Sequence, residues 1–322
     1  NLYGGTVTLF GHTLKRFGIE VRFADMSDPA SIEAQIDENT RLVYTESVGN
    51  PRCNVDDLDA IAEVAHKYGL PLIVDNTVSP PPIFSPFEHG ADLVVASMTK
   101  VIGGHGTTIG GIVIEKGDFN WASGKFPEIS EPDEAYHGVN FWDCFGNHGD
   151  AVAPGMSFTL KVRCCLLRDT GACLSPLAAQ QVILGVETLP MRAQKHCENA
   201  HAVARYLSDH PLVEWVNYAG LERHPDYERC RRLMPLGPSA VFGFGVKGGL
   251  EAGKRFIESV ELCSHLANIL DARTLVIHPA STTHQQLTEP ELEAAGVTPD
   301  FVRISVGLEE VAVLLACRLR HR

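Results

Sequence analysis

The sequence predicts an α/β fold, with a mostly parallel sheet flanked by helices and a smaller α+β domain after it. In the first 115 residues, short apolar runs alternate with an amphipathic segment, which is typical of parallel strands joined by a helical crossover. The 322 residues exceed the size at which one hydrophobic core usually stops growing. We therefore expect two domains, residues 1–178 and residues 179–322.

The first domain is expected to contain five short strands rich in β-branched and aliphatic residues. They cover residues 20–25, 41–46, 71–76, 92–97 and 110–115. Between the second and third runs, apolar residues recur at helical spacing, at Leu58, Ile61, Ala62 and Ala65. An aspartate before this segment and Gly69 after it are typical start and stop signals, so the spacing predicts a helix there.

The rest of the chain changes pattern twice. Residues 116–145 lack periodicity and carry aromatics, prolines and acids, which predicts a long ordered loop or insertion. The pattern is helical again from about 146 to 207, and residues 186–207 predict a connecting helix with Pro190 near its first turn. The remainder mixes helices with strands at 239–246 and 301–307.

Composition excludes several classes of protein. The formal charge is −13 and no basic run stands out, so a nucleic-acid partner is not expected. The longest apolar runs are too short to span a bilayer. Nine cysteines without a C-x-x-C pair fit neither a disulfide framework nor a zinc site, which favours a cytoplasmic location. Because the chain starts at Asn1 rather than at a methionine, we expect a segment before it.

Polar residues follow three of the expected strands, at the edge where parallel sheets bind ligands. They are residues 46–50, 75–77 and 97–100. Asp75 and Lys100 end two strands about one βαβ unit apart, so they could face one another across a cleft. A carboxylate and an amine placed in this way suit pyridoxal phosphate, and the hydroxyls of Ser97 and Thr99 could bind its phosphate.

Structural roles remain open for these residues on spacing alone. A strand-end aspartate is a common helix N-cap, and a strand-end lysine is usually solvated. The glycines at 103–111 follow Lys100, so they match neither the P-loop nor the dinucleotide-binding motif. By themselves they indicate only a tight backbone path.

Longer motifs resemble the pyridoxal-phosphate-dependent enzymes of Cys/Met metabolism, which include cystathionine γ-synthase and γ-lyase. The motifs are YGGT at 3–6, ESVGNP at 46–51, DNT at 75–77, SMTKVIGGHG at 97–106 and FVRISVGLE at 301–309. The resemblance implies the fold-type-I, aspartate-aminotransferase-like fold. Further segments are most similar to the O-acetylhomoserine sulfhydrylase group, at 125–138, 167–176, 185–192 and 275–309.

The resemblance implies a role for each residue of the cofactor site. Lys100 would be the Schiff-base lysine and the base that moves protons at the substrate's α and β carbons. Asp75 would pair with the pyridine nitrogen, and Ser97 with Thr99 would bind the phosphate. Asn50 matches an asparagine near the phenolic oxygen of the cofactor. Tyr3 matches a tyrosine that stacks on the ring and assists proton transfer; otherwise it is an aromatic residue in a turn.

Substrate binding is expected at Arg303, Thr274 and Asn50. In the strand at 301–307, Val302, Ile304 and Val306 share one face, which leaves Arg303 on the other face. A guanidinium can bind the carboxylate of an amino acid at two points. Thr274 stands where the family usually has serine, and it keeps the hydroxyl.

The implied activity is γ-replacement on O-acetyl-L-homoserine by sulfide or a small thiol, giving homocysteine or methionine and acetate. Alternatives are γ-elimination, as in methionine γ-lyase, and use of the O-succinyl ester. A truncated, non-catalytic homologue is an alternative of another class, because the family's long forms begin earlier, with a glycine phosphate loop. Those forms also carry a tyrosine and arginine that reach into a neighbouring subunit, so a homo-oligomer of at least two chains is expected.

No metal site is expected. His105, His278 and His284 have no spacing typical of zinc ligands, so packing or loop hydrogen bonds are the expected roles. Cys164 and Cys165 fall in a helical stretch and are expected to be small buried side chains.

Overall fold

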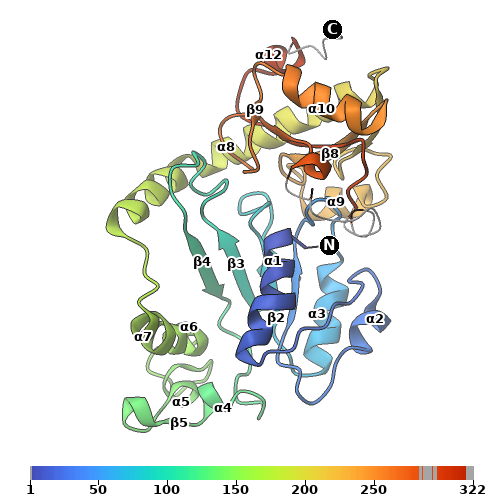
Figure 1. Cartoon of the computed structure of the whole chain (residues 1–322). Helices are drawn as coiled ribbons and strands as arrows, with labels where there is room; N and C mark the ends of the chain where they lie inside the picture. The colour runs from blue at the N-terminus through green and yellow to red at the C-terminus, as the bar shows by residue number, and fades with distance from the viewer. Residues whose placement is uncertain (1, 283–284, 286–291, 293–295, 317–322) are drawn as a thin grey trace.

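The computed structural model describes residues 2–282, 285, 292 and 296–316. Two sheets lie one above the other and the long helix α8 (Pro176–Ser208) runs beside both (Figure 1). In the first sheet the three parallel strands are followed by an antiparallel edge strand, β4. Its order is β1 (Val43–Glu46), β2 (Leu72–Asp75), β3 (Leu93–Ser97) and β4 (Gly111–Glu115). The α/β fold predicted from the sequence is confirmed.

Residues 20–25 form no strand, which corrects the prediction for this segment. Its apolar side chains are not buried; Phe23 is 51% exposed. The amide of Asp25 bonds to the hydroxyl of Ser31 rather than to a neighbouring strand. Only Ala24 packs against the main core, and without a ladder partner the segment does not become part of a sheet.

Helix α3 (Leu58–Lys67) covers one face of the first sheet, as predicted. The Asp57 carboxylate accepts a hydrogen bond from the amide of Ala60, and the chain leaves the helix through Gly69 at φ 65°. The opposite face of the sheet carries Tyr44, whose ring meets Phe10 edge-on at 4.9 Å. Phe10 follows helix α1 (Gly4–Thr8), which lies in front of β2 in Figure 1.

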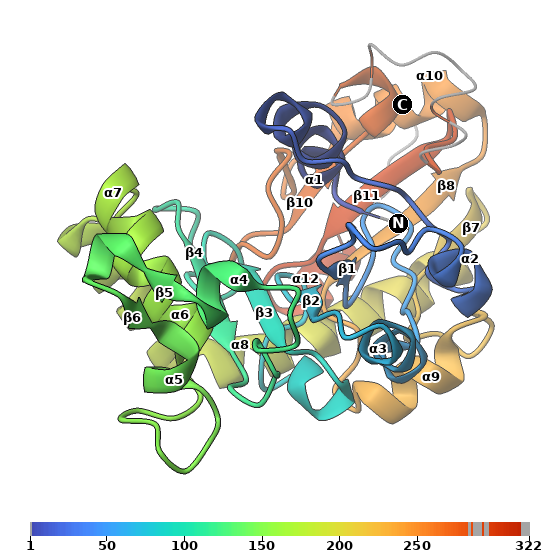
Figure 2. The ribbon, with the colours of Figure 1, turned by 90° about the horizontal axis from the view of Figure 1, so that it is seen from below.

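The predicted insertion at 116–145 is ordered and has its own small core. It contains α4 (Pro127–Ser130), β5 (Pro132–Asp133), β6 (Val139–Asn140) and α5 (Phe141–Phe145). Aromatic rings fill its centre, and Trp121 stacks on Phe158 at 5.3 Å. Viewed from below, the insertion lies at the opposite end of the molecule from the second sheet (Figure 2).

A helical stretch follows, made of α6 (Ser157–Lys161), a π-helical segment (Val162–Leu167) and α7 (Arg168–Thr170). Cys164 and Cys165 lie in it and pack against the aromatic core of the insertion. Both are half-buried rather than buried, so our expectation was right about the helix and too strong about burial. Free thiols are present at Cys53, Cys144, Cys164, Cys165, Cys173, Cys197 and Cys230.

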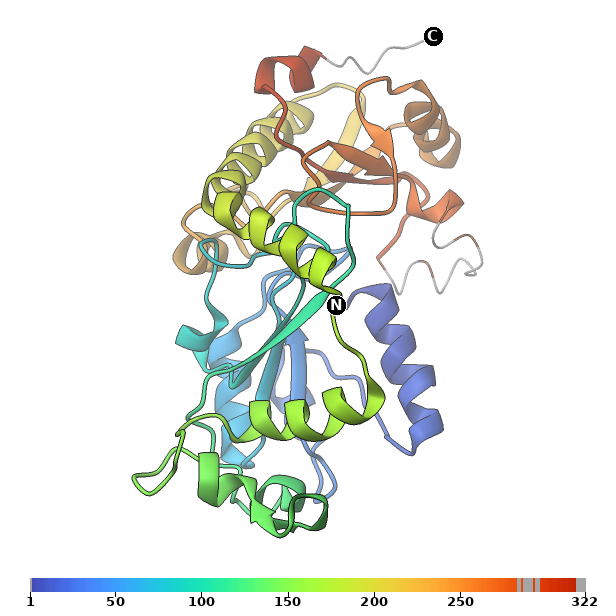
Figure 3. The same ribbon diagram turned by 90° about the vertical axis from the view of Figure 1, so that its left-hand side faces the viewer.

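Helix α8 begins earlier than we predicted. The hydroxyl of Ser175 caps it by accepting from the amide of Ala178 at 3.2 Å, and Pro176 takes the first turn. Pro190 therefore lies in the helix interior, not near the first turn. Packing along the helix outweighs the one hydrogen bond that Pro190 cannot donate. Figure 3 shows α8 extending from the first sheet to the second.

The second sheet is mainly antiparallel and contains both strands predicted for this region. Its order is β7 (Val213–Asn217), β8 (Val241–Val246), β11 (Phe301–Ser305), β10 (Leu275–Ile277) and β9 (Ser264–His265). The helices of this part of the chain are α9 (Tyr227–Leu233), α10 (Gly249–Ser259) and α12 (Val311–Ala316); α10 contacts β8 and β11, and α12 contacts α8. One further short helix, α2 (Pro29–Glu33), lies near α3.

We propose that the domains divide near residue 178, since the first sheet lies wholly before it and the second wholly after it. In the part of the chain that the structure describes, no helix combines the length and apolar character needed to cross a membrane.

One ion pair beneath the first sheet predicts a pH-dependent stability. Nε2 of His66 lies 2.9 Å from Oδ2 of Asp92, and this hydrogen bond raises the pKa of His66. A raised folded-state pKa stabilises the protein fully below the unfolded value, and this stabilisation is lost as pH rises through the folded value. We compare the unfolding free energy of wild type with that of His66→Gln. The advantage of wild type should be larger at pH 5.5 than at pH 8.5, by up to about 1 kcal/mol.

Urea unfolding at the two pH values measures this difference. A difference that stays constant with pH would show that the pair contributes no electrostatic stability.

Candidate active site

Lys100 lies in a tight turn after β3. The amide of Gly103 bonds to the carbonyl of Met98 at 2.9 Å, and that of Gly104 to the carbonyl of Lys100 at 2.7 Å. The amine of Lys100 crosses to the second sheet's domain and donates to Oδ1 of Asn268 at 2.5 Å. Burial lowers the pKa of Lys100, and the positive charge of Arg303 lowers it further.

Arg303 lies on β11, between β8 and β10. Its Nη2 donates to the carbonyl of Ala267 at 2.5 Å and to that of Asn268 at 3.4 Å. Asn268 thus contacts both cations, through its side chain and its backbone. Neither Lys100 nor Arg303 is in an ion pair with any described residue, so this region favours an anionic ligand.

Asp75 ends β2 on the face of the sheet opposite α3. Its Oδ1 accepts from the amide of Thr77 at 2.9 Å, and its Oδ2 accepts from the phenol of Tyr44 at 3.2 Å. Asp75 pairs in register with Val95 of β3, so Ser97, two residues later, shares its face. The backbone amide of Ser97 bonds to the hydroxyl of Thr77 at 2.8 Å, which ties the two strand ends together.

Glu46 is a buried acid beside Asp75, its partner in register on β2. Its Oε1 accepts from the backbone amide of Tyr3 at 2.7 Å. Burial and then the charge of Asp75 raise the pKa of Glu46 to about 8. Burial beside the same two acids raises the pKa of Tyr44, which keeps its phenol a hydrogen-bond donor to Asp75.

Tyr3 opens helix α1 with its ring lying against Gly5, where a Cβ would come within 2.5 Å of the ring. The ring is 57% exposed, and its phenol is within electrostatic reach of Arg303. Asn50 is buried after Gly49 and precedes a cis peptide bond to Pro51. The structure therefore places these two residues on the loops that border the ends of β1 and β2.

Two expected hydroxyls have partners within the protein. Oγ1 of Thr99 lies 3.1 Å from the amide and 3.3 Å from the carbonyl of Gly110. Thr274 is fully buried; its hydroxyl donates to Glu309 at 2.8 Å and accepts from Gly307 at 2.8 Å. This geometry argues against direct substrate contact by Thr274 and favours a role in holding the chain after β11.

The histidines behave as expected for loop hydrogen bonds. His105 lies 2.7 Å from the carbonyl of Gly103, and His278 bonds to Ser281 and to the carbonyl of Pro299, both at 2.8 Å. His284 lies outside the described residues. Among those residues no cluster of His, Cys, Asp and Glu could hold a metal ion.

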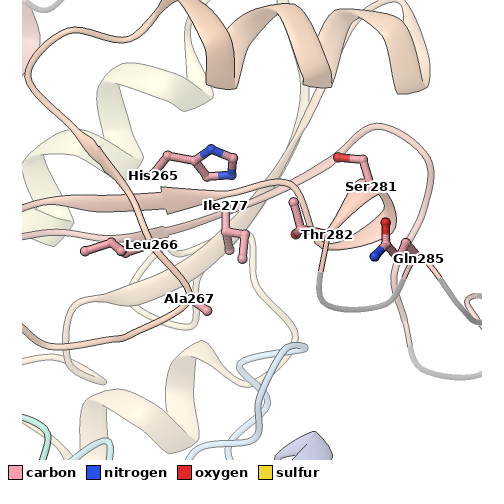
Figure 4. Close-up of a pocket in the computed structure, with 7 residues that line it drawn as sticks. All are labelled: His265, Leu266, Ala267, Ile277, Ser281, Thr282 and Gln285. Carbon is pink, nitrogen blue, oxygen red and sulfur yellow. The ribbon is translucent and has the colours of Figure 1, made fainter.

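An open pocket of about 500 Å³ lies in the second sheet's domain (Figure 4). Ile277, one of its walls, pairs in register with Arg303 on β11, and Ala267, another wall, accepts a hydrogen bond from the guanidinium. It is lined by His265, Leu266, Ala267, Ile277, Ser281, Thr282 and Gln285. Two walls of the pocket are therefore neighbours of Arg303.

The model of one family, described as Cys/Met metabolism PLP-dependent enzymes, matches residues 1–317. The chain belongs to this family. It is 49% identical over 316 residues to O-acetyl-L-homoserine sulfhydrylase of Leptospira meyeri, covering 98% of this chain and 72% of that protein. It is 46% identical to homocysteine synthase of Schizosaccharomyces pombe, with the same coverage.

Among solved structures, a Campylobacter jejuni protein assigned as an O-acetylhomoserine (thiol)-lyase matches with a TM-score of 0.91 and 38% identity. The match covers 98% of this chain and 74% of that one, and that structure contains a pyridoxyl-lysine monophosphate. The fold-type-I pyridoxal phosphate enzyme fold predicted from the sequence is confirmed.

The residues present fit the cofactor of this Cys/Met metabolism family. An amine with a lowered pKa can attack an aldehyde, and Lys100 provides it. A carboxylate hydrogen-bonded by two neighbours can hold a protonated ring nitrogen, and Asp75 provides it. The exposed ring of Tyr3 offers an aromatic surface.

Sequence reasoning missed Asn268 and Tyr44, and it placed Glu46 at the polar strand end without giving it a role. Asn268 contacts Lys100 across 168 positions of sequence, a pairing that no local pattern indicates. Glu46 and Tyr44 alternate on the strand just before the polar strand end, which was the one available signal.

The buried acid Glu46 predicts a second pH effect. Because its folded pKa of about 8 lies above the ordinary value, folding favours the protonated form, and stability falls as pH rises from about 5 to about 8. Glu46→Gln keeps the acceptor for Tyr3 and cannot ionise. In the cofactor-free protein, the unfolding free energy of Glu46→Gln relative to that of wild type should rise by at least about 1 kcal/mol from pH 5 to pH 9.

Chemical denaturation across this range gives the result, with the exposed Glu38→Gln as control. If both variants track wild type in parallel, the carboxyl of Glu46 titrates normally and the inferred raised pKa is wrong.

Proposed function

We propose that the protein catalyses γ-replacement on O-acetyl-L-homoserine, using sulfide or a small thiol and releasing acetate. The observation that carries the proposal is the joint placement of Lys100 and Arg303 around Asn268. Similarity along 98% of the chain to proteins named O-acetyl-L-homoserine sulfhydrylase supports it. The product would be homocysteine with sulfide, or methionine with methanethiol.

When bound, pyridoxal phosphate supplies an electron sink that acidifies the hydrogens on the substrate's α carbon. Lys100 provides the base that removes and returns these protons. Its lowered pKa keeps a larger share of the amine neutral near pH 7 than an exposed lysine would have. Asp75 would hold the ring nitrogen, and Asn50 the phenolic oxygen.

The hydroxyl of Ser97 and the strand-end backbone would bind the phosphate. The hydroxyl of Thr99 donates its one hydrogen to the carbonyl of Gly110, so it would bind the phosphate only by giving up that bond. Tyr3 would cover the ring and pass a proton near the departing group, since its ring is exposed and its phenol is within electrostatic reach of Arg303.

Arg303 would fix the α-carboxylate of the substrate. Its guanidinium is held by the carbonyl of Ala267, which leaves other N–H groups to grip a carboxylate. In the overall exchange the Cγ–O bond breaks, the Cγ–S bond forms, and the thiol's proton balances the released acetate. Substrate binding by Asn50 and Thr274 stays a prediction, and the buried hydroxyl of Thr274 makes it the weaker one.

Two related reactions compete with this proposal. A methionine γ-lyase-like enzyme would release 2-oxobutanoate without sulfide, and an O-succinylhomoserine-using synthase would prefer an ester with a second carboxylate. We favour the acetyl ester because the relatives that match along the chain are named for it. A truncated, non-catalytic homologue is disfavoured by the intact set of site residues.

We also propose a cytoplasmic homo-oligomer that binds neither nucleic acid nor membrane. Free thiols suit a reducing compartment. Large apolar side chains stay exposed on the first half of α8, at Leu177, Ile183, Leu184 and Met191. Several large exposed apolar side chains on one helix are typical of a subunit interface.

Incubation of the loaded protein with each ester tests the substrate. Homocysteine should form from O-acetylhomoserine and sulfide at least about ten times faster than from O-succinylhomoserine. Production of 2-oxobutanoate without sulfide at a comparable rate would replace the proposal with the lyase alternative.

Lys100→Ala should abolish cofactor attachment and lower turnover by at least about a thousandfold, because it removes both the covalent anchor and the base. Borohydride reduction followed by peptide mass analysis locates the attached cofactor. The exposed Lys247→Ala serves as control and should retain both. Cofactor trapped on another lysine in the wild type would refute the assignment of Lys100.

Arg303→Lys keeps the charge and loses the two-point geometry. We expect the KM for O-acetylhomoserine to rise about tenfold or more, with a smaller change in kcat. Steady-state kinetics measure this, and Arg273→Lys, an exposed arginine on the neighbouring loop, should leave KM unchanged. An unaltered KM in Arg303→Lys would mean that another group binds the carboxylate.

A further inference from the structure

Arg192 is a buried cation that the proposed reaction does not use. It lies on α8 and is 7% exposed. Within the described part of the chain it forms no ion pair, and burial lowers its pKa. A guanidinium buried without a carboxylate destabilises the protein unless hydrogen-bond acceptors surround it.

Those acceptors are backbone carbonyls from one short segment and from α8 itself. Nη1 donates to the carbonyl of Val101 at 2.6 Å, and Nη2 donates to that of Ile102 at 3.2 Å. Nη2 also donates to the carbonyl of Gly185, and Nε to the hydroxyl of Thr188 at 3.0 Å. All three nitrogens of the planar fork are therefore engaged.

The first two carbonyls directly follow Lys100. The turn at 98–104 uses the carbonyls of Met98 and Lys100 for its own amides. The next two carbonyls, of Val101 and Ile102, accept from Arg192 instead. Carbonyls at the end of a turn favour a positive group, as they do at a helix C-terminus. Val101 is fully buried, so water does not replace the guanidinium there.

Glycines allow this close contact. A Cβ on Gly104 would lie 2.2 Å from Nη1 of Arg192, and a Cβ on Gly185 would lie 2.6 Å from the carbonyl oxygen of Gly103. The backbone of the turn thus packs directly against the backbone of α8, and the guanidinium of Arg192 bonds to both. Arg192 therefore holds the turn through its backbone, in addition to the packing of Val101 and Ile102 in the core.

The same face of α8 also holds the chain that follows Arg303. Nδ1 of His196 lies 2.8 Å from the carbonyl of Val306, and Nδ2 of Asn199 donates to that of Gly307 at 2.9 Å. One rigid helix therefore fixes the backbone just after both proposed site cations. Helix α8 therefore contributes to the spacing between Lys100 and Arg303, because it binds the backbone next to each of them.

We propose that Arg192 is a positioning residue for Lys100, holding the turn so that the amine reaches the cofactor and the substrate's α carbon. The inference rests on the proposed function only for attachment of pyridoxal phosphate to Lys100.

The test compares Arg192→Met and Arg192→Lys in the full chain loaded with pyridoxal phosphate. Gln194→Ala, on an exposed position of the same helix, is the control. Arg192→Met should lower kcat by about 10- to 100-fold with KM for O-acetylhomoserine changed less than about threefold, because a small misplacement affects the chemical step most. Arg192→Lys should recover part of this loss. The control Gln194→Ala should keep the wild-type kcat and KM.

A second readout does not depend on turnover. The absorbance of the lysine-bound cofactor, titrated with pH, reports the surroundings of the Lys100 nitrogen. The midpoint should shift by at least about half a pH unit in Arg192→Met and stay at the wild-type value in Gln194→Ala. Thermal unfolding measured in parallel gives the folded fraction of each variant.

A kcat loss that only follows the folded fraction, with an unshifted titration, would overturn the proposal. If Arg192→Met does not fold, the titration of Arg192→Lys decides in the same way. A shifted titration in a protein that does not convert O-acetylhomoserine would support Arg192 as a positioning residue while refuting the proposed substrate.

Discussion

The site depends on one amine kept close to a second cation with a neutral amide between them. Lys100 and Arg303 both bind Asn268, and neither is in an ion pair with a described residue. An acid beside Lys100 would raise its pKa and hold it protonated, whereas burial and Arg303 lower it. The same arrangement leaves positive charge available for the anions that an amino-acid substrate and a phosphate bring.

The two cations come from different sheets, so their spacing depends on what joins the sheets. Lys100 follows β3 of the first sheet, and Arg303 lies on β11 of the second. Besides α8, the amide of Ala272 bonds to the carbonyl of Gly104 at 3.0 Å. This bond links the Lys100 turn to the loop that carries Asn268. Two connections therefore hold the site together: helix α8, and the hydrogen bond between Ala272 and Gly104.

Local patterns predicted what depends on local structure. Helix α3, with its aspartate cap and its exit at Gly69, follows from spacing and turn residues, and so do the strands that end at Asp75 and Ser97. They could not predict that residues 20–25 lack a ladder partner, or that α8 continues through Pro190, because both depend on tertiary packing. Asn268 was missed for the same reason: its contact with Lys100 exists only once the two sheets are assembled.

Leu270 shows how the fold holds Asn268 in place. Its φ is 56°, a left-handed conformation that costs a leucine roughly 1–2 kcal/mol. Such a conformation persists only where its surroundings determine it; here the side chain is fully buried and the backbone amide donates to the hydroxyl of Ser305 at 2.7 Å. Ser305 lies two residues after Arg303 on β11. The turn that presents Asn268 to Lys100 is therefore bonded to the strand that carries Arg303. A shift of β11 would thus move Arg303 and Asn268 together relative to Lys100.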